Sequence, residues 1–138
     1  MQTLIIINDP PYGTERLYNG LRLTIVPVDA TGQVSAQAVV DAVHPDTALV
    51  SIMLANNEVG TLQPVADIAR QLAGRGVLLH TDSAQAVGKI AIDVEALGID
   101  LLTIAGHQFQ ASKGIGALYV LSMPDTGPSH CLARPRVK

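Results

Sequence analysis

The chain has 138 residues, of which 48% are hydrophobic and only 15% are charged, and its net charge is −3. This length suits one globular domain, and the composition lies far from that of disordered proteins. The three lysines and six arginines are scattered along the sequence, which argues against nucleic acid or an anionic membrane surface as a partner.

Membrane insertion, disulfides and metal sites are not expected from the sequence. No apolar run approaches the roughly 20 residues of a membrane helix, and no basic segment precedes an apolar one at the start. We therefore expect a soluble, cytoplasmic protein. Cys131 is the single cysteine, so an internal disulfide is excluded. The four histidines are far apart and none pairs at helical spacing, so no metal site is expected.

The first part of the chain predicts two strands and a helix. A short apolar run at residues 4–7 predicts a buried strand, which two prolines stop shortly afterwards. A second strand is expected at 23–28, with a turn at 29–32. A helix is expected at 35–43, because Ser35 is a good N-cap and the following apolar residues recur at helical spacing.

The second part continues the alternation of strands and helices. The clearest buried strand is expected at 47–54, and a helix is expected to begin at Pro64 and to end near residue 73. Three further apolar runs predict strands, at 77–81, 100–104 and 116–121.

This alternation is typical of α/β proteins in which a mostly parallel sheet is flanked by helices. We predict a single α/β domain over residues 1–121. Residues 122–138 are rich in turn-forming residues and lack periodicity, so they are predicted to form a tail.

Polar side chains directly follow three of the predicted strands. They are Asn56, Asn57 and Glu58, then Asp82 and Gln85, and finally His107 and Gln108. In open parallel sheets, the carboxyl ends of the strands line the crevice in which ligands bind. One such cluster usually only satisfies nearby backbone groups, but three together indicate a ligand site.

Four motifs occur in order along these segments: LANNEVG at 54–60, HTDSAQAVG at 80–88, GHQF at 106–109 and KGIGALYV at 113–120. Over residues 23–120 the chain resembles the cysteine desulfurases and selenocysteine lyases, which have the class V aminotransferase fold. The resemblance implies part of the large domain of a fold type I, pyridoxal-phosphate (PLP) dependent transferase. It also implies PLP as the cofactor.

The resemblance assigns roles to four residues. Asp82 would pair with the pyridinium nitrogen of PLP and keep it protonated, so that the ring can accept electrons. Gln85 would hydrogen-bond the phenolic oxygen of the ring, and Asn57 would support the same edge. His107 would help to hold the phosphate, together with backbone groups of a nearby turn.

The chain departs from the family pattern at the position that performs the chemistry. Relatives have a lysine that forms a Schiff base with PLP, and this chain has Gln108 there. A carboxamide nitrogen is not a usable nucleophile, so we predict no catalytic residue and no desulfurase turnover. Ala105 replaces a hydroxyl that often binds phosphate. Lys113 belongs to a separate downstream motif, and its use would demand a rebuilt loop.

The flanks of the resembling region also differ from the family. Counterparts of the upstream phosphate-binding turn and of the downstream small domain are not recognisable, and Cys131 does not match the sulfur-accepting cysteine. Residues 3–23 instead resemble the start of DsrE-type sulfur-relay proteins. We therefore interpret the chain as a truncated or chimeric large domain, in which the strand at 4–7 pairs with the sheet and could cover an edge left open.

Three functions remain open. The first is a desulfurase-like domain that binds PLP weakly and without a covalent bond. The second is a structural or interaction module, and an apolar face left open would favour a homo-oligomer. The third and least favoured is a sulfur relay through Cys131. If activity persisted, the substrate would be an amino acid, cysteine or selenocysteine, from which sulfur or selenium is removed to leave alanine.

Overall fold

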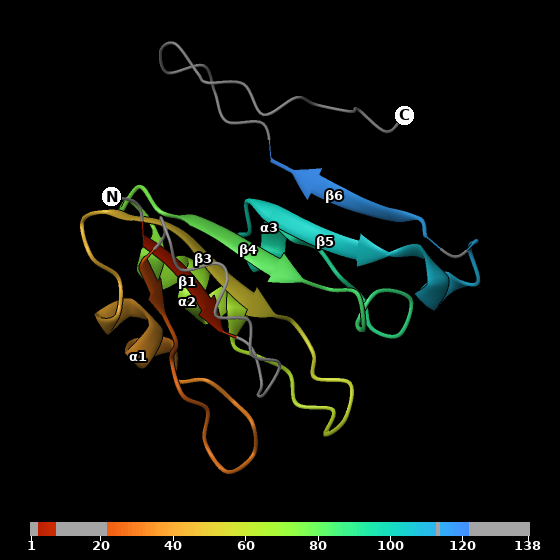
Figure 1. Cartoon of the computed structure of the whole chain (residues 1–138), viewed down its shortest axis with the longest axis horizontal. Coiled ribbons are helices and arrows are strands. Elements are labelled where there is room, and N and C mark those ends of the chain that lie inside the picture. Colours follow the sequence, from red (N-terminus) through yellow and green to blue (C-terminus); the bar gives the residue numbers. More distant parts are fainter. Residues whose placement is uncertain (1–2, 8–21, 113, 122–138) are drawn as a thin grey trace.

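A computed structural model describes residues 3–7, 22–112 and 114–121, which form one sheet with short helices packed against it (Figure 1). The elements in chain order are β1 (Thr3–Ile7), β2 (Arg22–Thr24), α1 (Ala36–Asp41), β3 (Thr47–Met53), α2 (Val65–Leu72), β4 (Leu78–Asp82), α3 (Val94–Leu97), β5 (Leu101–Ala105), the 3-10 helix η2 (Gly106–Phe109) and β6 (Gly116–Val120).

The sheet has six strands in the order β2-β1-β3-β4-β5-β6. The first five are parallel to one another, and β6 runs antiparallel to β5. The expected α/β fold with a mostly parallel sheet is therefore confirmed. Because β3, β4 and β5 are parallel, the segments that follow them all leave the sheet at the same edge.

The strand at the start of the chain has an unexpected place in the sheet. The prediction that residues 4–7 pair with the sheet is confirmed, since β1 is hydrogen-bonded to both β2 and β3. The idea that this strand covers an edge is wrong, because β1 lies inside the sheet and the three-residue strand β2 forms the edge. The sheet order gives no support to the separate origin expected for residues 3–23, and most of that segment lies outside the described residues.

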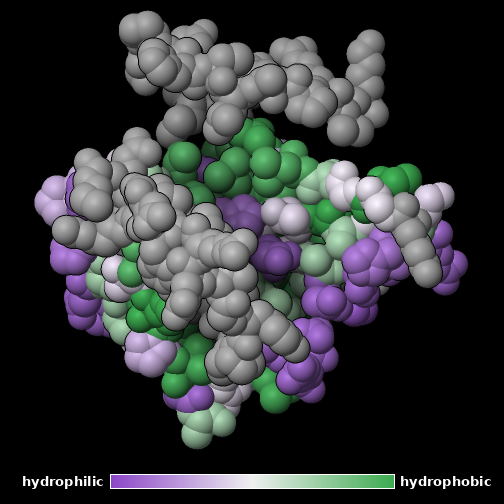
Figure 2. All heavy atoms as spheres, in the orientation of Figure 1, coloured by the Kyte–Doolittle hydropathy of each residue, from purple (hydrophilic) through white to green (hydrophobic). Residues whose placement is uncertain are grey.

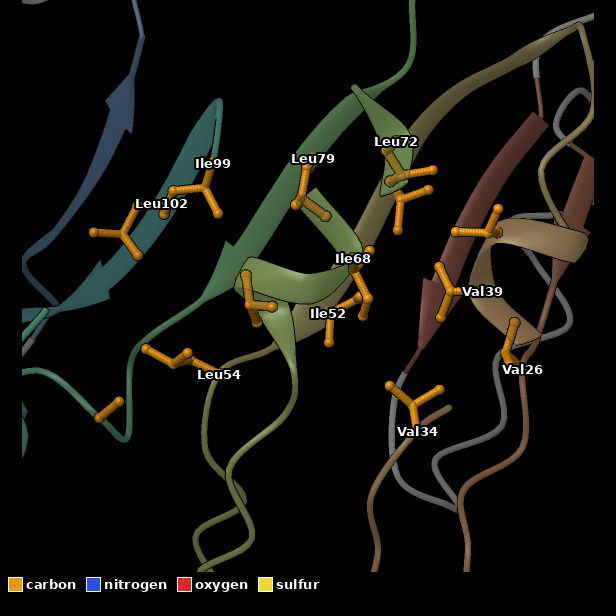
Figure 3. Packing of buried hydrophobic residues seen from close by; sticks show 14 residues of the cluster. Val26, Val34, Val39, Ile52, Leu54, Ile68, Leu72, Leu79, Ile99 and Leu102 are labelled. Carbon is orange, nitrogen blue, oxygen red and sulfur yellow. The ribbon is translucent and has the colours of Figure 1, made fainter. Parts of the chain in front are cut away.

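The three α-helices pack on one face of the sheet, where the hydrophobic core lies. Helix α2, which connects the neighbouring strands β3 and β4, contacts both α1 and α3. Right-handed crossovers that advance in one direction across a parallel sheet place their helices on the same face. Ile52 of β3, Ile68 of α2 and Leu79 of β4 are almost completely buried between these layers (Figure 3). Among the described residues, no helix lies on the opposite face, where alternate strand residues such as Ser51 and His80 are half-buried.

The local sequence explains most element boundaries. Ser35 is the N-cap of α1, as predicted, and its hydroxyl accepts a hydrogen bond from the Ala38 backbone. The second strand is shorter than expected and ends at Thr24, and Pro27 has no N–H with which the ladder could continue to residue 28. The short helix α3 was not expected. Asp93 caps it by accepting from the Glu95 and Ala96 backbone N–H groups.

Apolar side chains gather over β6 at the antiparallel end of the sheet (Figure 2). The largest exposed ones there are Ile115, Leu118, Val120 and Leu121. None of the helices in the described part of the chain is long and apolar enough to cross a membrane. The predicted tail at 122–138, with Cys131, and the side chain of Lys113 lie outside the described residues.

Candidate functional site

The three polar clusters expected from the sequence meet at one edge of the sheet. Met53, the last residue of β3, lies opposite Asp82, the last residue of β4, and Asp82 lies opposite Thr103 of β5. The backbone N–H of Leu54 donates to the Asp82 carbonyl at 2.8 Å, which joins the two strand ends. Asp82 is therefore the central residue of the candidate site.

The two asparagines after β3 have different structural roles. Asn56 is buried, and its Oδ1 accepts from the backbone N–H groups of Glu58 at 2.8 Å and Val59 at 3.0 Å. These bonds form an Asx turn that closes the loop after the strand. Asn57 lies at the exposed tip of this turn. The structure thus leaves the Asn57 side chain accessible to a ligand, while Asn56 builds the loop.

Asp82 is half-buried and partly engaged by the backbone. Its Oδ1 accepts from the Ala84 N–H at 2.9 Å, which fixes the carboxylate where the chain turns away from the sheet. Ser83, the next residue, is completely buried, and its hydroxyl is the one buried side-chain polar atom without a hydrogen-bond partner among the described residues. The turn after β4 therefore holds one carboxylate at the site edge.

A lysine that the sequence analysis did not single out connects two of the predicted positions. The Nζ of Lys89 donates to Oε1 of Gln108 at 3.2 Å and to Oε1 of Gln85 at 3.5 Å. Gln85 and Gln108 are half-buried and Lys89 is exposed. The only sequence signal was the spacing of four residues from Gln85, which is too common to be informative.

His107 and Gln108 lie in η2, directly after β5. The backbone of the preceding Gly106 is packed closely: a Cβ at this position would lie 2.8 Å from the carbonyl oxygen of Ile115. Only glycine fits there, so the start of η2 is fixed against the loop before β6. His107 is exposed, in contrast to Asp82, and is the least enclosed of the predicted site residues along with Asn57.

A second feature missed by the sequence analysis is a hydrogen-bonded row across three strands. The Nδ1 of His80 is 2.8 Å from the Ser51 hydroxyl, and its Nε2 is 2.7 Å from the Thr103 hydroxyl. Burial lowers the pKa of His80 below its ordinary value of 6.5, and the nearby Asp82 carboxylate partly opposes this change. Polar residues alternating with apolar ones in these strands were the available signal.

The lowered pKa of His80 predicts that the folded protein becomes less stable as the pH falls. Because the fold lowers the pKa of His80, the unfolded chain binds more protons than the folded chain as the pH falls below 6.5. The contribution of neutral His80 to the free energy of unfolding is therefore fully present above pH 6.5. It is lost as the pH falls through the lower pKa of His80 in the folded state. Urea unfolding between about pH 8 and about pH 5 should show this decrease.

The matched variants for this prediction are His80→Gln and His107→Gln. The first should flatten the pH dependence in the range below 6.5, and the second should keep it, because His80 remains in place. An unchanged pH profile in His80→Gln would show that other groups cause the decrease.

The described residues contain no group of three or more His, Cys, Asp or Glu side chains that could hold a metal ion. The polar side chains at the sheet edge are instead the carboxylates of Asp82 and Glu58, several carboxamides, an imidazole and an amine. This set of groups suits an organic ligand that carries both hydrogen-bonding and charged atoms.

Comparison with known proteins places this arrangement in a family. A family model described as "Aminotransferase class-V" matches residues 14–126. The chain belongs to the aminotransferase class-V family. A cysteine desulfurase from Homo sapiens is 46% identical over 105 residues, which are 76% of this chain and 23% of that protein. The cysteine desulfurase IscS from Methanosarcina thermophila is 46% identical over 101 residues, 73% of this chain and 25% of that protein.

Solved structures agree with the class V assignment. The structure of SspA in complex with cysteine superposes with a TM-score of 0.73 at 38% identity, covering 86% of this chain and 36% of that one. The resemblance to the cysteine desulfurases and the fold type I prediction are thereby confirmed. The chain spans about a quarter of the length of these two curated relatives and carries part of the class V fold.

Proposed function

We propose that this chain is a cysteine desulfurase-type large-domain segment that binds PLP along one edge of the ring and does not turn over cysteine. The observation that carries the proposal is the grouping of Asp82, Gln85 and Gln108 at the carboxyl edge of the sheet, with Lys89 hydrogen-bonded to both glutamines. Asp82 provides a carboxylate and Gln85 provides a hydrogen-bonding amide. Gln108 has no amine with which to bond covalently to the cofactor.

The donor set fits one part of the cofactor. When bound, PLP supplies an electron sink for charge that develops on an amino-acid substrate. Asp82 fits a protonated ring nitrogen, because its carboxylate is held in place by Ala84 and its Oδ2 accepts no hydrogen bond from the described residues. A charge-assisted bond of this kind is stronger than a neutral one, so Asp82 is the main binding residue in this proposal.

Three further side chains would contact the same cofactor, those of Gln85, Asn57 and His107. Gln85 accepts from Lys89 with its Oε1, which leaves its amide nitrogen to donate to a phenolic oxygen. Asn57 is exposed after β3 and would support the same edge, and the exposed His107 would contact the phosphate. These three side chains orient the ligand but perform no proton transfer in the proposal.

Gln108 is the reason why turnover is not proposed. Its carboxamide nitrogen is not nucleophilic, so it can neither bond covalently to an aldehyde nor carry a proton to or from a substrate carbon. In the structure its Oε1 accepts from Lys89 and lies at the same edge as Asp82. Removing covalent catalysis at this position would cost many orders of magnitude in rate.

A second candidate function is a structural or interaction module in which the cofactor edge is unused. It is favoured by the sheet face that carries no helix among the described residues, and by the exposed apolar side chains along β6, such as Leu118 and Val120, each 55% exposed. Apolar surface of this kind is typical of contacts with another chain.

Binding of pyridoxine 5′-phosphate separates the two functions. This compound shares the ring nitrogen, phenolic oxygen and phosphate of PLP but has an alcohol instead of the aldehyde, so it measures noncovalent recognition alone. We expect binding by the native chain in equilibrium dialysis. Asp82→Ala should weaken it by about tenfold, because a hydrogen bond to a charged group is lost.

The control is Asp67→Ala, which removes a carboxylate on the exposed side of α2 and should leave the affinity unchanged. Absence of binding by the native chain would contradict the proposal and favour the interaction module. Formation of alanine and sulfide from cysteine by the native chain with PLP would contradict the proposed lack of turnover.

A further inference from the structure

We propose that Lys89 supplies the amine that residue 108 lacks, and that it captures the aldehyde of PLP covalently at this edge. The proposal rests on the proposed function, since it requires the cofactor to lie along Asp82 and Gln85. It adds a covalent attachment residue on the turn after β4, a place other than position 108.

The position of the amine carries the inference. The Nζ of Lys89 lies 3.2 Å from Oε1 of Gln108 and 3.5 Å from Oε1 of Gln85. A lysine at position 108 would extend its amine from the same backbone position as the Gln108 carboxamide. The Lys89 amine is therefore directly beside the end of the side chain that it would replace. Lys89 is also exposed, so a ligand can reach it.

The turn that carries Lys89 is fixed against η2. The Lys89 backbone N–H donates to the Ala86 carbonyl at 3.0 Å, and Ala86 is buried. Gly88 adopts a positive φ of 80°, and a Cβ there would lie 3.1 Å from the Phe109 ring. The short distance between Lys89 and Gln108 is thus supported by the contact of Gly88 with the Phe109 ring as well as by the two flexible side chains.

The glutamine at position 108 favours this placement of Lys89. A lysine there would offer no acceptor, and two ammonium groups at this distance would repel each other. Gln108 provides a carbonyl oxygen that draws the Lys89 ammonium toward the site edge. Glutamine in place of lysine at position 108 therefore removes one amine and also allows the Lys89 amine to approach.

The covalent step is a condensation and needs no further reactant. The Lys89 ammonium first gives one proton to solvent water. The resulting neutral amine adds to the aldehyde carbon of PLP, the carbon–oxygen double bond breaks, and a carbon–nitrogen double bond forms as water leaves. Both amine protons depart with the aldehyde oxygen as that water. No oxidant or reductant is involved, and no amino-acid substrate is consumed.

Trapping with borohydride and peptide mapping tests the proposal directly. The chain has three lysines, Lys89, Lys113 and Lys138, so each can be mapped separately after digestion. At PLP concentrations below those that label free lysine, we expect the phosphopyridoxyl group on Lys89. Lys89→Arg, which keeps the cation next to Gln108, should reduce total labelling by about tenfold or more, since the oriented amine is lost.

Lys113→Arg is the matched control and should keep the labelling of Lys89. The proposal is overturned if Lys89 is labelled no faster than Lys138, or if Lys89→Arg is labelled as strongly as the native chain. Pyridoxine 5′-phosphate cannot condense with an amine, so its binding reports on the proposed function alone. Normal binding of that compound without Lys89 labelling would contradict only the present inference, whereas loss of both would contradict the proposed function as well.

Discussion

Gln108→Lys is expected to give the chain a covalent PLP adduct at residue 108. The substitution restores an amine in η2, beside Gln85 and at the edge where Asp82 would hold the ring. An oriented amine reacts faster than a free one by about an order of magnitude or more, so labelling at residue 108 should exceed labelling of Lys138 by at least that ratio. Absorbance of the protein with PLP, followed by borohydride reduction and peptide mapping, measures the result.

The restored lysine should also change the behaviour of Lys89. With the Gln108 acceptor gone, Lys89 loses its 3.2 Å hydrogen bond, and repulsion between the two amines moves it away from the site. We therefore expect the label to move from Lys89 to residue 108 in this variant. This redistribution connects the variant to the trapping experiment on the native chain.

Two controls accompany this variant. Gln110→Lys adds a lysine two residues away at an exposed position, so it should be labelled no faster than Lys138. Gln108→Met keeps the side-chain length without an amine and should gain no label at residue 108. If Gln108→Lys stays colourless and unlabelled at residue 108, the missing amine is not what limits covalent binding.

Ile52→Ala is expected to cause the largest loss of stability. Ile52 lies in the central strand β3, is completely buried, and points toward Ile68 of α2 in the core (Figure 3). Truncation would leave a cavity between sheet and helices that neither layer can close easily. The expected decrease in the free energy of unfolding is about 3 kcal/mol. Urea unfolding followed by circular dichroism measures it as a lower midpoint.

Ile115→Ala is the matched control, because Ile115 is 57% exposed in the loop before β6. Its effect should stay within about 0.5 kcal/mol, as for other surface substitutions. If Ile52→Ala is already unfolded without urea, Ile52→Val should show a smaller loss of about 1 kcal/mol. Equal effects at positions 52 and 115 would contradict the described core.

Several features of the fold could be predicted because they depend on local sequence. The strand at 47–54 is a nearly continuous apolar run, and the structure has β3 there. Ser35 predicts the start of α1 because N-capping needs only the residues that follow it. The predicted strand at 23–28 is too long: β2 ends at Thr24, and Pro27 could not donate to a ladder beyond it.

The candidate site was predicted in its residues but not in its contacts. The order of the motifs along the chain was enough to select Asp82, Gln85, His107 and Gln108, and to find that an amine is missing at position 108. The row formed by Ser51, His80 and Thr103 was not predicted, because it joins three strands that are 29 and 23 residues apart in sequence.

The fold class, the family resemblance and the absence of a lysine at position 108 could be predicted without coordinates, because each depends on residue identity and local periodicity. The place of β1 inside the sheet, and the contact of Lys89 with Gln108 across 19 residues of chain, are seen only in the folded molecule. The physical reason is that strand order and side-chain contacts depend on pairing between distant segments. The sequence shows that position 108 has no amine, but only folding brings the Lys89 amine next to that position.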